Sequence, residues 1–179
     1  ACDDLDGGEV LRGGVISRFR GPQPEIRGYP NADEQAKAVT DSILALIKDG
    51  REPGSIGIFA RDRKLFEPIE RALKDNQVRR VRIRRDMSLV DLSEVRLGTM
   101  HSAKGLEFRS VFVLSVNDGV LPHPNALAAE DPADVEQAME HERQLLYVSM
   151  TRAREELRVC YYGRPSLFLV EAVLIEKLS

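Results

Sequence analysis

The sequence contains no tryptophan, only two cysteines, and no apolar stretch near the roughly 18 residues that a membrane-spanning helix needs. Cys2 and Cys160 are too few for a disulfide framework and lack the spacing of a structural metal site. The first ten residues are acidic and contain glycines, unlike a signal peptide. These absences favour a cytoplasmic protein with no membrane partner and no metal site of its own.

The remaining composition is typical of one globular domain. Apolar residues make up 42 % and charged residues 31 % of the 179 residues, enough to bury a core. A net charge of −3 argues against a uniformly basic surface but leaves room for a local basic groove. Because the chain opens on Ala1, we interpret residues 1–24 as a linker or a partial element and expect a piece of a longer protein, whose folded domain spans residues 25–179.

Hydrophobic periodicity predicts strands that alternate with helices. Four helices are expected, from Asn31 to near Gly50, around 65–73, from Asp131 to about 151, and after Ser166. Five strands are expected, at 55–60, 80–84, 95–99, 110–116 and 157–161. Pro68 falls inside the second helix and leaves its start uncertain. This alternation predicts an α/β fold, with a mostly parallel sheet covered by helices on both faces.

Three segments, in the order 56–61, 99–108 and 142–154, resemble helicase motifs IV, V and VI. Together they make residues 25–162 similar to the second RecA-like motor domain of UvrD/Rep-type superfamily 1 DNA helicases. The resemblance implies a RecA-like fold and a part in an ATP-dependent helicase or translocase that moves 3′ to 5′. Its expected partners are single-stranded DNA and the first RecA-like domain of the same protein.

An arginine in motif VI can assist ATP hydrolysis. The reaction builds negative charge on the γ-phosphate, and a planar guanidinium offsets that charge with two directed hydrogen bonds. An arginine supplied from a neighbouring domain accelerates such reactions by about 10³- to 10⁵-fold. The resemblance assigns this arginine-finger role to Arg152 and a second phosphate-facing role to Arg61. An arbitrary arginine would more often be a solvated charge on a helix.

The resemblance also implies contacts made by motif V. Gly105 and Glu107 would lie on the nucleotide side, where a carboxylate can accept a hydrogen bond from a ribose hydroxyl. The plainer interpretation of Glu107 is a surface carboxylate that caps a helix. Thr99, His101 and Lys104 would contact single-stranded DNA, although a lone histidine is more often structural.

Residues 79–85 contain five arginines. Such a strand could follow a phosphate backbone, because each neutralised phosphate releases counterions. It could equally be the edge of a sheet kept soluble by charge, and we favour this second interpretation.

The sequence departs from the family pattern in several places. It contains neither a GxxxxGK[S/T] phosphate loop nor the acidic magnesium-binding motif, so ATP and Mg²⁺ are expected to bind mainly on the missing first domain. We therefore expect the chain alone to hydrolyse ATP negligibly. Ala60 stands where many relatives carry a tyrosine that stacks on adenine. Only residues 86–98 separate the arginine-rich strand from motif V, where UvrD and Rep carry a large inserted domain.

Two other functions remain open. The chain could be a non-catalytic RecA-like module that docks nucleic acid or protein, or the motor part of a helicase–nuclease fusion. The joint presence of Arg61, Glu107 and Arg152 favours the motor, because a degenerate copy need not keep all three.

Overall fold

The structure is a computed structural model that describes residues 24–84, 91–128 and 130–178. Cys2 and all but the last residue of the segment interpreted as a linker therefore lie outside the described residues.

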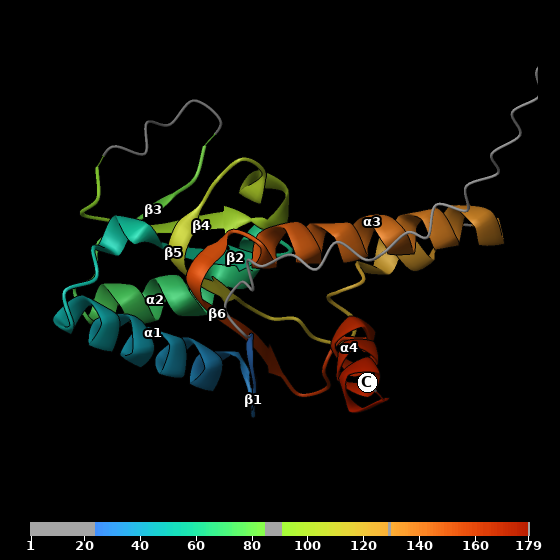
Figure 1. Ribbon diagram of the computed structural model, residues 1–179, viewed down its shortest axis with the longest axis horizontal. Helices are drawn as coiled ribbons and strands as arrows, with labels where there is room; N and C mark the ends of the chain where they lie inside the picture. The colour runs from blue at the N-terminus through green and yellow to red at the C-terminus, as the bar shows by residue number, and fades with distance from the viewer. Residues whose placement is uncertain (1–23, 85–90, 129, 179) are drawn as a thin grey trace, which may run out of the picture.

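Six strands form one sheet in which every neighbouring pair is parallel (Figure 1). The strand order is β1-β6-β5-β2-β4-β3. The strands are β1 (Glu25–Tyr29), β2 (Ile56–Ala60), β3 (Arg80–Arg82), β4 (Val95–Thr99), β5 (Phe108–Val113) and β6 (Ala153–Tyr162). The predicted α/β class is confirmed, and β3 is an edge strand as the charged sequence indicated.

Helices cover both faces of the sheet. The α-helices are α1 (Ala32–Lys48), α2 (Glu67–Asp75), α3 (Pro132–Met150) and α4 (Leu167–Leu178). Short 3₁₀ helices are η1 (Pro53–Ser55), η2 (Arg63–Phe66), η3 (Met100–Ala103) and η4 (Pro124–Leu127). One core cluster joins α1 and α2 to one face, and a second joins α3, α4 and η3 to the other. In Figure 1, α1 and α2 lie side by side, while α3 extends well beyond the sheet.

Local chemistry explains where the predicted helices begin. The side chain of Asn31 accepts a hydrogen bond from the backbone N–H of Glu34, and that of Asp131 accepts one from Ala133. Pro68 is no obstacle, because η2 precedes α2 and places this proline in the first turn, where its missing N–H is not needed.

Four strands differ from the sequence-based prediction. β3 ends at Arg82 instead of residue 84, and β6 spans Ala153–Tyr162 instead of 157–161. β1 was not predicted, and it is an edge strand whose three central residues are exposed, so it carries no apolar pattern. β5 begins at Phe108 and ends at Val113, whereas the prediction placed it at 110–116. The chain beyond Val113 turns instead, because Ser115 adopts a left-handed backbone conformation with φ of 56°.

A buried hydrogen-bonded pair holds this turn. The backbone N–H of Ser115 donates to Oε1 of Gln35 over 3.1 Å, and Nε2 of Gln35 donates to the Ser115 hydroxyl over 3.2 Å. Both residues are almost fully buried. A non-glycine residue in the left-handed region persists only where its surroundings fix it, so Gln35 stabilises the exit of the chain from β5.

We expect Gln35→Met to lower the free energy of unfolding by about 2 kcal/mol, because it leaves the buried Ser115 N–H without an acceptor. Urea unfolding of the 179-residue chain measures this. Lys37→Met, which places the same side chain at an exposed position of α1, should change stability by less than about 0.5 kcal/mol. Equal effects of the two substitutions would contradict this account of Gln35.

Candidate functional site

The carboxyl ends of β2 and β4 meet at one edge of the sheet. Ala60 and Thr99 are partners in the parallel ladder, so the residues that follow them leave the sheet side by side. Arg61 follows β2 directly, and His101 lies in η3 after β4. Ligands of open parallel sheets commonly bind at this edge. A hollow here is lined by both residues and by Asp62, Arg63, Lys64, Thr99 and His123.

Arg61 forms a bidentate ion pair with Glu142 of α3. Its Nε donates to Oε2 of Glu142 over 2.8 Å and its Nη2 donates to Oε1 over 2.7 Å. The same Oε2 accepts the backbone N–H of His123 over 3.0 Å. The side chain of Glu142 is 4 % exposed and that of Arg61 is 14 % exposed. This pair links β2, the loop before η4 and α3.

The ion pair shifts the pKa values of both members. Burial alone raises the pKa of Glu142, but hydrogen bonds from Arg61 and from the His123 N–H, together with the charge of Arg61, lower it below its ordinary value. The hydrogen bond to Glu142 raises the pKa of Arg61 despite desolvation. Both groups are therefore charged at neutral pH, and the carboxylate stays ionised even though it is buried.

Arg152 lies just beyond the carboxyl end of α3. Its Nε donates to the carbonyl of Val148 over 3.0 Å, its Nη1 to the carbonyl of Leu106 over 3.1 Å, and its Nη2 to the Thr151 hydroxyl over 3.2 Å. A cation at this end of a helix is favourable, because the last carbonyls lack partners and carry partial negative charge. The guanidinium thus caps α3 and ties it to the turn before β5.

Gly105 and Glu107 lie in that same turn. Gly105 has φ of +79°, which glycine adopts easily, and a β-carbon there would meet no atom within 4 Å. The requirement for glycine is therefore conformational. Glu107 is exposed and forms an ion pair with Arg154 in β6. The structure thus groups Gly105, Glu107 and Arg152 at one end of α3.

The two predicted phosphate-facing arginines, Arg61 and Arg152, contact α3 at different places along its length. Ten residues separate Glu142, which binds Arg61, from Arg152, a length of about 15 Å in a helix. One rigid helix therefore carries the contacts of both arginines.

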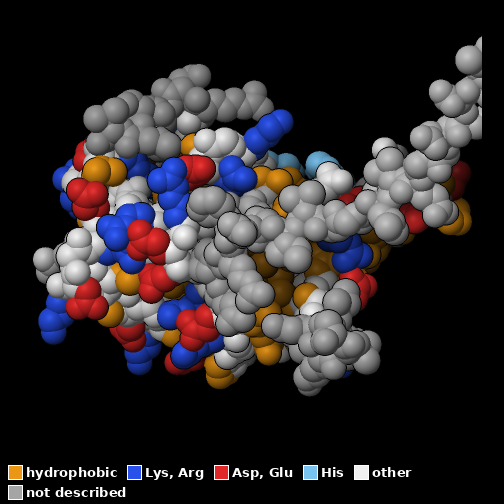
Figure 2. All heavy atoms as spheres, in the orientation of Figure 1, with side chains coloured by type: hydrophobic (Ala, Val, Ile, Leu, Met, Phe, Trp, Pro, Cys, Tyr) orange, Lys and Arg blue, Asp and Glu red, His pale blue; other side chains and the backbone are white. Residues whose placement is uncertain are grey.

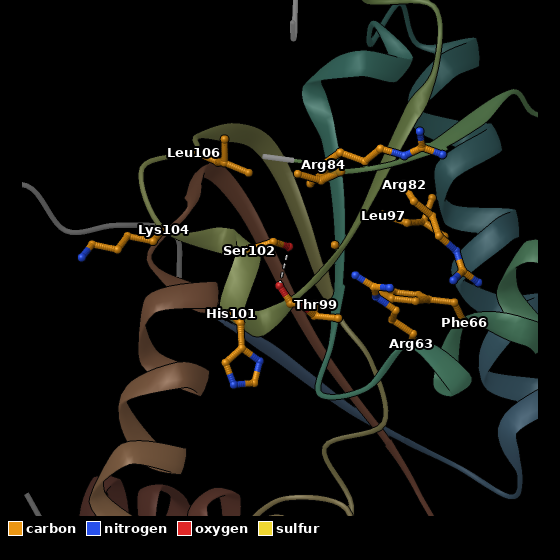
Figure 3. Close-up of a pocket in the computed structure, with 12 residues that line it drawn as sticks. Arg63, Phe66, Arg82, Arg84, Leu97, Thr99, His101, Ser102, Lys104 and Leu106 are labelled. Carbon is orange, nitrogen blue, oxygen red and sulfur yellow. Dashed lines mark hydrogen bonds between the residues drawn. The ribbon is translucent and has the colours of Figure 1, made fainter. Parts of the chain in front are cut away.

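Thr99, His101 and Lys104 do come together, on the wall of a groove of about 680 Å³ (Figure 3). The Ser102 hydroxyl donates to the carbonyl of Thr99 over 2.8 Å and tightens η3. The opposite wall is formed by side chains of η2 and of the end of β3, among them Phe66 and three arginines that the motifs did not place here, Arg63, Arg82 and Arg84. The signal for Arg82 and Arg84 was the arginine-rich segment 79–85, which we interpreted as a soluble edge, whereas Arg63 lies outside that segment.

The basic groups of this groove differ in how they are neutralised. Arg82 forms a bidentate ion pair with Glu70, in which Nε and Nη2 donate to the two carboxylate oxygens over 2.7 and 2.8 Å. Its guanidinium also lies over the Phe66 ring. Arg63, Arg84 and Lys104 have no carboxylate partner within the described ranges. Desolvation and the nearby charge of Arg61 lower the pKa of His101, so it is neutral at neutral pH. Among the described residues, Arg63, Arg84 and Lys104 are therefore the cations of the groove without an ion-pair partner.

The visible surface does not divide into one basic and one acidic face. In Figure 2, Lys and Arg side chains are interspersed with Asp and Glu over the end of the molecule that carries the sheet. In the described part of the chain, no group of three or more His, Cys, Asp and Glu side chains could hold a metal ion. No helix among these residues is both long and apolar enough to cross a membrane.

Glu142 is the first residue of the segment 142–154, and the resemblance assigned it no role. The buried residues of α3 are Glu142, Leu146 and Ser149, which share one face of the helix. An acidic residue on the stripe that faces the core was therefore the available signal.

Comparison with known proteins adds to these observations. Residues 82–164 match the family described as the UvrD-like helicase C-terminal domain. The ATP-dependent DNA helicase Rep of Buchnera aphidicola is 41 % identical over 90 residues, which cover 44 % of this chain and 13 % of that protein. The ATP-dependent DNA helicase PcrA of Staphylococcus aureus is 41 % identical over 93 residues, covering 45 % of this chain and 12 % of the relative. The chain thus spans about an eighth of these relatives.

A solved structure shares the fold. The C-terminal domain of a possible DNA helicase from Lactobacillus plantarum WCFS1 superposes with a TM-score of 0.60 at 24 % identity, covering 84 % of this chain and 80 % of that one. This likeness bears on the fold, which agrees with the RecA-like architecture that the motifs predicted.

We expect Arg61→Met to lower the free energy of unfolding by about 3 kcal/mol, because it leaves the buried Glu142 carboxylate without its partner. Combining it with Glu142→Met should recover part of the loss, since two apolar side chains leave no buried charge, although the His123 N–H loses its acceptor. Thermal unfolding of the three variants measures this. A double variant less stable than Arg61→Met alone would contradict the expectation.

Proposed function

Because residues 82–164 match the UvrD-like helicase C-terminal domain and the chain is similar to the Rep and PcrA helicases, we propose that it is the second motor domain of an ATP-dependent DNA helicase or translocase. ATP binds between this domain and a first RecA-like domain, and the protein moves 3′ to 5′ along single-stranded DNA in the cytoplasm. Residues 25–179 form the domain, without a large insertion, because β3 ends at Arg82 and β4 begins at Val95.

One observation carries this proposal. Residues of the segment 99–106 line the basic groove, and the carbonyl of Leu106 in this segment accepts a hydrogen bond from Arg152 at the end of α3. A single short connection thus joins the groove to the proposed arginine finger. When the two domains close on ATP, Arg152 would leave the Leu106 carbonyl for the γ-phosphate, and the turn that holds Lys104 would be released. Nucleotide binding and the DNA grip are coupled through this connection.

The groups present fit a phosphate better than a metal ion. Arg152 and Arg61 supply the donors that a developing phosphate charge needs, and Glu107 can accept a hydrogen bond from the nucleotide sugar once it leaves Arg154. The described residues offer no carboxylate cluster, and the sequence has no phosphate loop. Mg²⁺ and the β- and γ-phosphates are therefore held by the other domain, and this chain supplies the arginines.

The groove supports a place for single-stranded DNA. Lys104, Arg63 and Arg84 lie along it with charges left for phosphates, while Thr99 offers a hydroxyl. His101 is neutral and presents a flat ring on which a base can stack. Binding through such a groove depends on salt and little on sequence.

A non-catalytic docking module is the second candidate. Each nitrogen of Arg152 already has an acceptor within the domain, which is also what a purely structural arginine would show. The variant Arg152→Ala distinguishes the docking module from the motor.

Arg152→Ala, in the protein that contains both motor domains, should lower DNA-stimulated ATP turnover by about 10³-fold or more, because the γ-phosphate loses its guanidinium. The affinity for single-stranded DNA should change little, since Arg152 does not line the groove. Arg152→Lys should fail as well, because an ammonium lacks the two-donor fork. The exposed Arg164→Ala is the matched control. Unchanged turnover in Arg152→Ala would favour the docking module.

Lys104→Ala and Arg84→Ala should each reduce the slope of log affinity against log salt by about 0.7, because one phosphate contact is lost. Anisotropy titrations of a labelled oligonucleotide at several salt concentrations measure this slope. The control is Lys37→Ala, an exposed lysine of α1 that does not line the groove. If all three substitutions gave the same slope, the groove would not be the DNA path.

A further inference from the structure

The ion pair of Arg61 and Glu142 is more buried than a surface salt bridge. Within the described part of the chain it is the only pair in which both side chains are less than 15 % exposed. Exposed ion pairs contribute little to stability and leave both side chains mobile. A desolvated bidentate pair instead fixes the plane of the guanidinium. The position of Arg61 is thus set by Glu142 and not by solvent.

The carboxylate is itself held from a second direction. Its Oε2 accepts the backbone N–H of His123 in addition to Nε of Arg61. Because α3 positions the Glu142 backbone and the His123 N–H orients its oxygens, the carboxylate cannot rotate freely. Arg61 therefore binds to a rigid acceptor, and not to another mobile side chain.

One edge of the guanidinium remains available. Nε and Nη2 bind Glu142, while Nη1 has only a distant contact, 3.7 Å from Oδ1 of Asp62. Arg61 lines the hollow between the ends of β2 and β4. A guanidinium has five N–H donors, so this pairing leaves donors on the free edge for an oxyanion.

Resting on the proposed function, we propose that Glu142 is a positioning residue for ATP hydrolysis, which holds Arg61 with its free edge presented to the γ-phosphate. An arginine side chain on its own samples many rotamers, and fixing it before ATP arrives removes the cost of ordering it in the transition state. Glu142 touches neither nucleotide nor DNA, and it acts only through Arg61.

The test uses the protein that contains both motor domains. Glu142→Gln keeps the shape of the side chain but removes the charge and places an amide N–H against the guanidinium. We expect kcat of the DNA-stimulated ATPase to fall about 100-fold, the loss that a misplacement near 1 Å causes. The affinity for single-stranded DNA should remain within about twofold, because Glu142 does not line the groove. Glu136→Gln, an exposed residue of the same helix, is the control.

A double-variant cycle distinguishes positioning from a general structural role. If Glu142 acts through Arg61, then Arg61→Gln/Glu142→Gln should be no slower than Arg61→Gln alone. Independent, multiplying losses would overturn the proposal, as would a loss of kcat that goes with an equal loss of DNA affinity. Where Glu142→Gln folds poorly, Glu142→Asp takes its place in the cycle, because it retains a negative charge beside Arg61.

Failure of this inference is distinct from failure of the proposed function. Loss of turnover in Arg152→Ala with normal kcat in Glu142→Gln would remove the positioning role and leave the motor. Normal turnover in Arg152→Ala would remove the motor itself.

Discussion

β2 lies between β4 and β5 with all three strands parallel, and the hydrogen bonds of this ladder decide which residues leave the sheet together. Ala60 pairs with Thr99, so Arg61 and the η3 turn must emerge side by side. Arg61 and the η3 turn are far apart in the sequence. The hollow at this edge, the Arg61–Glu142 pair that borders it and the wall of the groove all depend on this register, because a shift by one residue would turn each side chain to the other face.

α3 connects the two proposed phosphate contacts. Its buried face holds Glu142, which orders Arg61, and its carboxyl end is capped by Arg152, which also binds the Leu106 carbonyl. A helix moves along its axis with little deformation, so a displacement of Glu142 also displaces the carboxyl end of α3 where Arg152 binds. Closure on a nucleotide would pull on both contacts and on the η3 turn together. Within the proposed function, this shared helix is how ATP binding would be coupled to DNA binding.

The sequence predicted elements whose signals are local. α1 and α3 have Asn31 and Asp131 as caps, and β2 is an uninterrupted apolar run. β1 escaped prediction because an exposed edge strand has no apolar pattern, and η3 because four residues show no periodicity. The motifs predicted Thr99, His101 and Lys104 as contacts to single-stranded DNA, and the structure adds that they line one groove. They could not predict the partner of Arg61, because Glu142 is 81 residues away and only the fold brings them together.

For the proposed DNA groove, the pairing of each arginine matters more than the net charge of the chain. The chain has 26 basic and 29 acidic residues, yet the charge that matters is what the fold leaves unpaired. Arg82 is bound to Glu70 and Arg109 to Glu155, so neither gains much from a phosphate. Arg84, two residues beyond Arg82, reaches the groove instead. A cation already paired within the domain releases fewer counterions on binding, so phosphate affinity follows the few unpaired groups rather than the total.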